Sequence, residues 1–305
     1  MKIKSVALFG AGAIGAYFIY GFSKAEDLDF CVIADGERKD RIEKEGFIIN
    51  GETYRPAVKT PEEAHGVDLL LIATKYHGLL NSLEEIQRIA DEHTVVISLL
   101  NGIDSEEILS SVIDPGQIVY SLMKISAERV GNRITFDAEK TPGLFAGERD
   151  SSTESERLLA LKELMEPLPI RYHFCEEIIS EQWKKYALNM AVNLPQAILG
   201  VGCGAYQDSE HVAFLRDRLE VEVRDVADAY DITFGPLDDN SSRWLKKARF
   251  STLQDLDAGR HTEVDMFCGV LMTKAAAKGI AVPYTEFCFH AISALEEKND
   301  GLFDY

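Results

Sequence analysis

Positive charge is scarce in this 305-residue sequence, which has 32 Lys and Arg against 51 Asp and Glu and a net charge of −19. Nucleic acids and anionic membranes bind basic surfaces, so this charge argues against both as partners. The sequence also lacks an apolar run near the about 20 residues that span a bilayer, and it begins without a charged and then apolar leader. We therefore expect a cytoplasmic protein that binds neither nucleic acid nor membrane.

Cysteine is equally sparse. The five residues form no close pair: Cys31, Cys175, Cys203, Cys268 and Cys288. An odd number of separated cysteines is typical of reduced thiols, and none has the spacing of a zinc site, so we expect no metal centre. The composition, 46% hydrophobic and 27% charged, is that of an ordinary globular protein, and the length suits two domains better than one.

A glycine-rich turn follows the first apolar segment of the chain. Residues 5–9 have the length of a buried strand, and residues 13–24 have the apolar spacing of a helix. In a strand–turn–helix that binds a dinucleotide, the first glycine allows the tight turn, the second admits a pyrophosphate, and the third lets helix and strand pack closely. The helix N-terminus offers free N–H groups to the phosphates. We therefore predict a dinucleotide site at Gly10, Ala11, Gly12, Ala13, Ile14 and Gly15.

The end of the second predicted strand, residues 29–34, bears on which dinucleotide binds. Asp35 follows this strand, where an acidic residue bonds a ribose 2′-hydroxyl and repels a 2′-phosphate, which favours NAD. Arg38, Lys39 and Arg41 stand in the predicted loop that follows and could cover a 2′-phosphate. A plain turn at Asp35 is the alternative without a ligand. The local pattern leaves NAD and NADP both open.

Two later apolar runs also end in polar residues. Residues 67–74 lead to Lys75, and residues 94–100 lead to Asn101. Continuous apolar strands are typical of a parallel sheet that is buried on both faces, and ligands of such sheets bind beyond the carboxyl ends of the strands. We therefore expect Lys75 and Asn101 to lie near the glycine loop.

The other predicted elements complete an α/β pattern. We expect a hairpin around Asn50-Gly51, a helix over residues 79–91 and strands over 118–122, 133–137 and 143–147. Strands alternating with helices predict a Rossmann-like doubly wound sheet. From about Cys175 onward only helical periodicity is present. The predicted organisation is therefore a dinucleotide-binding domain at residues 1–174 and an all-helical substrate and catalytic domain at residues 175–305.

The first long helix of the second domain carries a polar stripe. Lys185, Asn189 and Asn193 are four residues apart, so they share one face of a helix, and apolar residues flank them. Buried amide and ammonium groups need partners, which favours a ligand site over a wet surface stripe. Pro195 should end or kink this helix, which would place Asn193 at its end. We call these three residues the polar seam.

Glu263 has a structural explanation in the sequence alone. Thr262 is an expected N-cap, and acidic residues are favoured in the first turn of the helix that follows. The periodicity by itself therefore assigns no ligand to Glu263.

Together these residues resemble ketopantoate reductases (2-dehydropantoate 2-reductases) over nearly the whole chain. The markers, in order, are the Gly10–Gly15 loop, Thr74-Lys75, Asn101-Gly102, Trp183 with the polar seam, residues 251–255, residues 260–265 and residues 279–283. The resemblance implies a Rossmann domain followed by a helical domain. It also implies NADPH-dependent reduction of 2-dehydropantoate to (R)-pantoate, a step of pantothenate and coenzyme A biosynthesis.

The resemblance further implies roles for individual residues. Lys185 would be the catalytic lysine, with Glu263 orienting or tuning it. Asn189 and Asn193 would contact the substrate, and Ser251 would help to hold its carboxylate. Asn101 and Glu263 would complete the site near the nicotinamide ribose, with Lys75 along the cofactor. An ammonium beside a carbonyl can stabilise an oxyanion and donate a proton, which suits reduction of a 2-keto acid.

Two departures from the family pattern keep alternatives open. Many members have a basic residue where this chain has Asp35, and many have Asn-Pro where this chain has Asn193-Leu194-Pro195. We expect NADP(H) to be preferred narrowly, with measurable use of NADH. The alternatives are a reductase of another small 2-keto acid and a non-catalytic dinucleotide-binding redox sensor. The sequence leaves the oligomeric state open, and a homodimer is the assembly considered.

Overall fold

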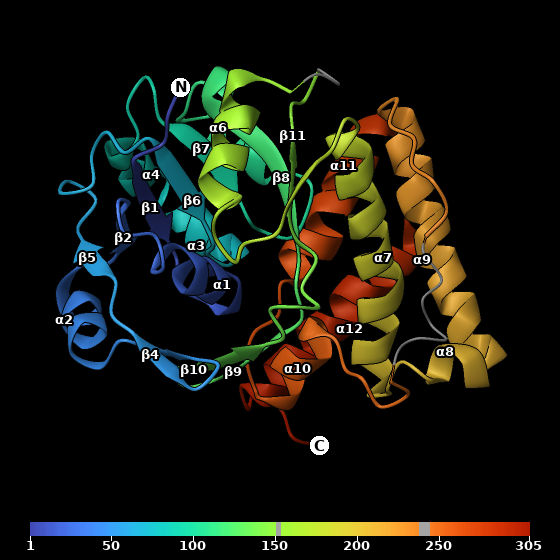
Figure 1. The fold of residues 1–305 in the computed structure, drawn as a ribbon. Helices are drawn as coiled ribbons and strands as arrows, with labels where there is room; N and C mark the ends of the chain where they lie inside the picture. Colours follow the sequence, from blue (N-terminus) through green and yellow to red (C-terminus); the bar gives the residue numbers. More distant parts are fainter. Residues whose placement is uncertain (151–153, 238–244) are drawn as a thin grey trace. The chain divides into compact units, whose positions relative to one another are not determined.

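The computed structural model describes residues 1–150, 154–237 and 245–305. The chain divides into two compact units, Met1–Ile179 and Ser180–Tyr305, and each is described by itself (Figure 1).

The first unit is built on an eight-stranded sheet in the order β12-β11-β8-β7-β6-β1-β2-β5. Every neighbouring pair is parallel except β11 with β8, which is antiparallel. The predicted doubly wound sheet is thus confirmed. Its strands are β1 (Ser5–Phe9), β2 (Asp29–Ile33), β5 (Ala57–Lys59), β6 (Leu69–Ile72), β7 (Val95–Ser98), β8 (Ile118–Lys124), β11 (Gly143–Gly147) and β12 (Tyr172–Phe174).

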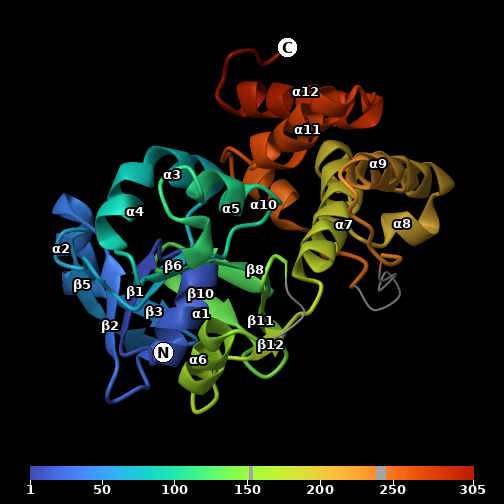
Figure 2. The same cartoon turned by 90° about the horizontal axis from the view of Figure 1, so that it is seen from above.

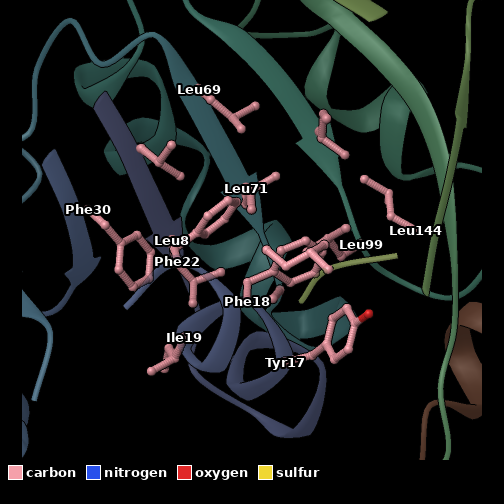
Figure 3. Packing of buried hydrophobic residues seen from close by; sticks show 14 of the residues in the cluster. Leu8, Tyr17, Phe18, Ile19, Phe22, Phe30, Leu69, Leu71, Leu99 and Leu144 are labelled. Atoms are coloured by element: carbon pink, nitrogen blue, oxygen red, sulfur yellow. The ribbon is translucent and has the colours of Figure 1, made fainter. Parts of the chain in front are cut away.

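Strand β1 shows why the sheet needs cover on both faces. Val6 and Leu8 belong to the core on one face, whereas Ala7 and Phe9 belong to the core on the other. Successive side chains of a strand point to opposite faces, so a strand that is apolar throughout is buried twice. Figure 3 shows Leu8 among side chains of α1 and of neighbouring strands on the first face.

Helices cover both faces of this sheet. Side chains of α1, α2 and α6 join the core on the Leu8 face, and side chains of α3, α4 and α5 join the core on the other. Two expectations are corrected here. The loop predicted after Asp35 is helix α2, and the single helix predicted over residues 79–91 is two short helices. The helices are α1 (Ala13–Phe22), α2 (Gly36–Glu45), α3 (Tyr76–Asn81), α4 (Leu83–Ile89), α5 (Ser105–Leu109) and α6 (Glu156–Met165), with a 3₁₀ turn, η1 (Pro115–Gln117).

A second, four-stranded sheet has the order β4-β3-β10-β9. The predicted hairpin is present: β3 (Phe47–Ile49) pairs antiparallel with β4 (Glu52–Tyr54) around Asn50 and Gly51, whose φ angles are 50° and 88°. Two positive φ angles are what a two-residue hairpin turn needs, and Asn-Gly supplies them at low cost. The other two strands are β9 (Ala127–Val130) and β10 (Arg133–Phe136).

Every secondary-structure element in the described part of the second unit is a helix or a helical turn (Figure 2). The predicted all-helical C-terminal region is therefore confirmed. Buried Glu222 on α9 accepts the backbone N–H of Tyr284 at 2.7 Å and that of Thr285 at 2.8 Å, so it caps α12. The elements are α7 (Ile178–Leu199), which begins in the first unit, then α8 (Ala205–Asp208), α9 (Glu210–Ala229), α10 (Ser251–Asp257), a π-helical turn η3 (Asp265–Gly269), α11 (Val270–Lys278) and α12 (Pro283–Asn299).

Helix α7 continues past Pro195 to Leu199, so the predicted helix end at this proline is wrong. Proline has no N–H for the helical ladder and disturbs the bonds around it. Here the hydroxyl of Tyr206 donates to the carbonyl of Val192, and the backbone N–H of Gln196 donates to that hydroxyl. Those two backbone groups would bond to each other in a regular helix. Tyr206 therefore bridges the disturbed turn and lets the helix continue.

Candidate active site

The three glycines of the loop meet different surroundings. Gly10 has a φ of +100°, and a Cβ there would lie 2.6 Å from the backbone carbon of Ala73. A Cβ on Gly15 would lie 2.4 Å from the carbonyl oxygen of Gly10. A Cβ on Gly12 would meet only the carbonyl oxygen of Ala73, at 3.9 Å. Internal packing thus explains Gly10 and Gly15, whereas Gly12 leaves open space beside the backbone.

The start of α1 fits an anionic ligand. Gly12 is the N-cap, no side chain caps the helix, and no acidic residue stands in its first turn. Ala13 and Ile14 are its first two residues and are half-buried, and Ala11 is buried. The first N–H groups of a helix have no partner inside the helix and favour phosphate. The loop therefore has the open backbone and free donors that a dinucleotide pyrophosphate requires.

Lys75 and Asn101 come to the same sheet edge as the glycine loop. Strand β6 lies between β1 and β7, and the register pairs Ile72 with Phe9 on one side and with Ser98 on the other. Lys75 lies three residues after the end of β6 and is exposed. Asn101 lies three residues after the end of β7 and is half-buried. Parallel strands end at one edge, so these two residues follow strands that end at the same edge of the sheet as β1, which leads into the glycine loop.

The segment after β2 has two kinds of charge. Asp35 is the N-cap of α2, and its carboxylate accepts the N–H of Gly36 at 2.6 Å. Lys39 pairs with Glu63 at 2.8 Å. Asp35 is exposed, so its carboxylate can face a ribose. Lys39 already has a carboxylate partner and is a poorer phosphate ligand than the sequence suggests.

Two arginines of α2 differ from Lys39. Arg38 and Arg41 are exposed, and within the described part of the chain neither has an ion-pair partner within 4 Å. The pKa of Arg38 is lowered, first by desolvation and then by the positive charges of Arg41 and Arg129. Three mutually repelling guanidinium groups favour the approach of an anion.

The polar seam lies on α7 as predicted. Lys185 and Asn189 are half-buried, and Asn193 is 5% exposed. Asn193 stands inside the helix instead of at its end, because α7 continues beyond it. The flanking residues Tyr186 and Met190 are buried. The stripe is therefore partly shielded from solvent.

Tyr186 connects this helix to the segment that carries Glu263. Its hydroxyl donates to the carbonyl of Phe267 in the π-helical turn η3. The N–H of Phe267 donates to the carbonyl of Glu263 at 3.0 Å. π-Helical turns often occur at functional sites. Glu263 is half-buried, and these two hydrogen bonds fix its backbone relative to α7. The bond on α7 is made by Tyr186, the residue that follows Lys185 in the sequence.

Ser251 is the first residue of α10 and is exposed. Sequence reasoning did not single out two residues close to it. Thr252 is 2% exposed, and its hydroxyl has no hydrogen-bond partner among the residues that the structure describes. Gln196 is fully buried on α7 and bonds the backbone just before Ser251. Only the position of Gln196, three residues after Asn193, could have indicated it.

No group of three or more His, Cys, Asp or Glu within residues 1–150, 154–237 and 245–305 could hold a metal ion. No helix among the same residues is both long and apolar enough to cross a membrane.

Comparison with known families covers most of the chain. The model of the ketopantoate reductase PanE/ApbA family matches residues 6–142, and that of the family's C-terminal part matches residues 177–296. The chain belongs to the ketopantoate reductase family. It is therefore an oxidoreductase.

Individual relatives agree in sequence and in fold. The 2-dehydropantoate 2-reductase of Mesorhizobium japonicum is 27% identical over 291 residues, covering 85% of this chain and 88% of that protein. A ketopantoate reductase structure from Ralstonia eutropha has a TM-score of 0.82 at 20% identity and covers 97% of this chain and 99% of its own. The ternary structure of D-mandelate dehydrogenase with NADH and anilino(oxo)acetate has a TM-score of 0.82 at 22% identity, with the same coverage.

Proposed function

We propose that this protein reduces 2-dehydropantoate to (R)-pantoate with NAD(P)H, as a step of pantothenate and coenzyme A biosynthesis. The observation that carries the proposal is the half-buried polar seam on α7, hydrogen-bonded through Tyr186 to the segment of Glu263, in a chain of the ketopantoate reductase family. We assign cofactor binding to a domain at residues 1–174 and the keto-acid chemistry to a domain at residues 175–305.

The residues of the second unit supply charge and a proton. The ammonium of Lys185 stabilises the oxyanion that develops on the keto oxygen and donates the proton that completes the alcohol. The carboxylate of Glu263 orients this ammonium. The amides of Asn189 and Asn193 hold the substrate, and the hydroxyl of Ser251 holds its carboxylate. Partial burial of the seam strengthens these interactions because water screens them less.

The residues of the first unit position the cofactor. Gly12 admits the pyrophosphate, and the N–H groups of Ala13 and Ile14 face it. When bound, the reduced nicotinamide supplies the hydride. Asn101 orients the ribose on the nicotinamide side, and Lys75 lies along the phosphates.

We propose a narrow preference for NADPH over NADH. The unpaired charges of Arg38 and Arg41 attract a 2′-phosphate, whereas Asp35 repels it and bonds a 2′-hydroxyl. Two cations against one carboxylate favour the phosphate. The exposed carboxylate keeps the difference small, so NADH supports a measurable rate.

A second candidate is a reductase of another small 2-keto acid. The likeness of fold to D-mandelate dehydrogenase favours it, because that enzyme was crystallised with NADH and the 2-oxo acid derivative anilino(oxo)acetate. The same seam of one lysine and two amides would act on the same carboxylate and carbonyl, with a different side group beyond them.

Steady-state kinetics with ketopantoate and each cofactor test the proposal. We expect turnover with both cofactors. At low cofactor concentration the rate with NADPH should exceed the rate with NADH. Replacing Lys185 by Ala should lower kcat by about 10² to 10⁴-fold, the range for loss of a general acid and oxyanion donor. Lys184→Ala is the matched control, because it removes the neighbouring lysine of the same helix.

The outcomes separate the candidates. No reduction of ketopantoate, with reduction of another 2-keto acid, would refute the substrate assignment and support the second candidate. Binding of the nucleotide without reduction across a panel of 2-keto acids would point to a redox sensor. A near-normal rate in Lys185→Ala would remove this residue from the mechanism.

A further inference from the structure

Gln196 makes three side-chain hydrogen bonds although it is fully buried. Its Oε1 accepts the backbone N–H of Phe250 at 2.6 Å. Its Nε2 donates to the carbonyl of Ala248 at 3.2 Å and lies 3.3 Å from the Sγ of Cys203. A buried amide that both accepts and donates in this way is fully integrated into the structure and expensive to replace.

The bonds of Gln196 fix the backbone that leads into Ser251. A second side-chain amide holds the residue between Ala248 and Phe250, because Nε2 of Gln254 donates to the carbonyl of Arg249 at 2.7 Å. Two glutamine side chains thus hold backbone groups of three consecutive residues, directly before Ser251. The side chain of Phe250 packs against a buried cluster on α7, α8 and α9, which anchors the same segment from the apolar side.

Helix α7 connects this segment to the polar seam. Gln196 follows Asn193 by three residues, so both lie on neighbouring positions of one helical face. The helix is regular enough to transmit position because Tyr206 bridges the turn at Pro195. The amide of Gln196 therefore joins the turn of α7 that follows Asn193 to the backbone that precedes Ser251.

We propose that Gln196 is a positioning residue for recognition of the substrate carboxylate: it holds Ser251 in register with the polar seam of α7. This inference rests on the proposed function, in which Ser251 and Asn193 contact the same 2-keto acid. Gln196 does not touch the substrate and acts only through the backbone of Ala248 and Phe250.

Replacement of Gln196 by Met tests the role. Methionine has a similar length but neither donates nor accepts strongly at the end of its side chain. We expect the KM for ketopantoate to rise about 10-fold, the equivalent of one lost substrate hydrogen bond, and the KM for NADPH to change less than about twofold. Thr285→Val is the matched control, because it removes a fully buried hydroxyl bonded to Glu222 elsewhere in the same unit.

Replacement of Gln196 by Glu provides a rescue that depends on pH. A protonated glutamic acid can donate to Ala248 and accept from Phe250, as the amide does, whereas an ionised one cannot donate. Burial raises the pKa of a carboxyl group, so the protonated form persists toward neutral pH. We expect the KM ratio of Gln196→Glu to wild type to be near one at low pH and to rise with pH.

Amide hydrogen exchange gives a readout that needs no activity. Exchange over residues 248–252 should be about 10-fold faster in Gln196→Met than in wild type, and unchanged in Thr285→Val. Unchanged exchange there, or an unchanged KM for ketopantoate in a folded Gln196→Met protein, would overturn the role of Gln196. An equal rise of both KM values would also overturn it. Absence of ketopantoate turnover in wild type refutes the proposed function instead.

Discussion

Two single-methyl substitutions separate Gly15, which the packing of the fold requires, from Gly12, which we propose that the cofactor pyrophosphate approaches. In Gly15→Ala the new Cβ would lie 2.4 Å from the carbonyl oxygen of Gly10, which belongs to the backbone and cannot rotate away. In Gly12→Ala the new Cβ would meet only one atom, at 3.9 Å, and the φ of −81° suits alanine. We therefore expect opposite effects from the same chemical change.

The magnitudes follow from these contacts. Overpacking costs typically 1–3 kcal/mol, so Gly15→Ala should lower the free energy of unfolding by about 2 kcal/mol despite the better helix propensity of alanine. For Gly12→Ala, a weaker N-cap and a less flexible unfolded chain nearly cancel, leaving a change below about 1 kcal/mol. Its methyl group would hold a pyrophosphate away from the N–H donors. Losing one such charged hydrogen bond costs roughly 1.5–3 kcal/mol, or about 10 to 100-fold in Kd.

Two measurements are sufficient: urea unfolding for stability and NADPH fluorescence titration for affinity. Gly235→Ala is the control, since Gly235 is exposed, has a negative φ and has nothing within 4 Å of its Cβ position. We expect it to change neither quantity. Wild-type NADPH affinity in Gly12→Ala would show that the pyrophosphate does not approach this glycine. Wild-type stability in Gly15→Ala would refute the close helix–strand contact.

Three further changes have definite expected outcomes. Tyr186→Phe removes the hydroxyl that donates to the carbonyl of Phe267. We expect kcat to fall about 10-fold and the free energy of urea unfolding to fall by about 1–2 kcal/mol. A loss of stability with an unchanged kcat would contradict a link between Tyr186 and Glu263. Thr252→Val replaces a buried hydroxyl that lacks a partner in the described structure, and we expect up to about 1 kcal/mol higher stability, so a clear loss would reveal an unseen partner. Alkylation at pH 7.5 should modify one thiol in the native protein and all five after denaturation, because four cysteines are buried and only Cys175 is partly exposed. Burial raises the pKa of all four buried thiols, to about 11 for Cys31 and to about 12 for Cys288, so each remains protonated and unreactive. Rapid alkylation of four thiols in the native protein would contradict this.

Local sequence rules were sufficient for the parts of the fold where one strong pattern acts. The buried strands of the parallel sheet are continuous apolar runs, and the Asn50-Gly51 hairpin has the dipeptide that its turn requires. Helix α2 was missed because its mean character is polar, with Ile42 as its one buried residue, so it has almost no apolar periodicity. The short strands β5, β9 and β12 have three or four residues each, too few for an alternating pattern.

The candidate site divides in the same way. Spacing alone places Lys185, Asn189 and Asn193 on one helical face, and the helix is observed. The continuation of that helix past Pro195 could not be predicted, because it depends on a tyrosine that arrives from another helix. Glu263 likewise has only a capping explanation in the sequence. Its relation to α7 depends on a tertiary hydrogen bond that no local pattern encodes.

These tertiary bonds also explain why α7 carries buried polar groups at positions where apolar residues would pack well. In the proposed mechanism the polar seam acts together with Glu263 and Ser251, so their two segments must be held relative to α7 to within a fraction of an ångström. Tyr186 near one end of the seam and Gln196 near the other each bind backbone of such a segment. Backbone bonding specifies position without depending on the flexible side chains of the segment. A redesign of α7 that replaced both residues by apolar ones should therefore fold and still lose activity. The loss of Tyr186 should lower kcat, and the loss of Gln196 should raise the KM for ketopantoate.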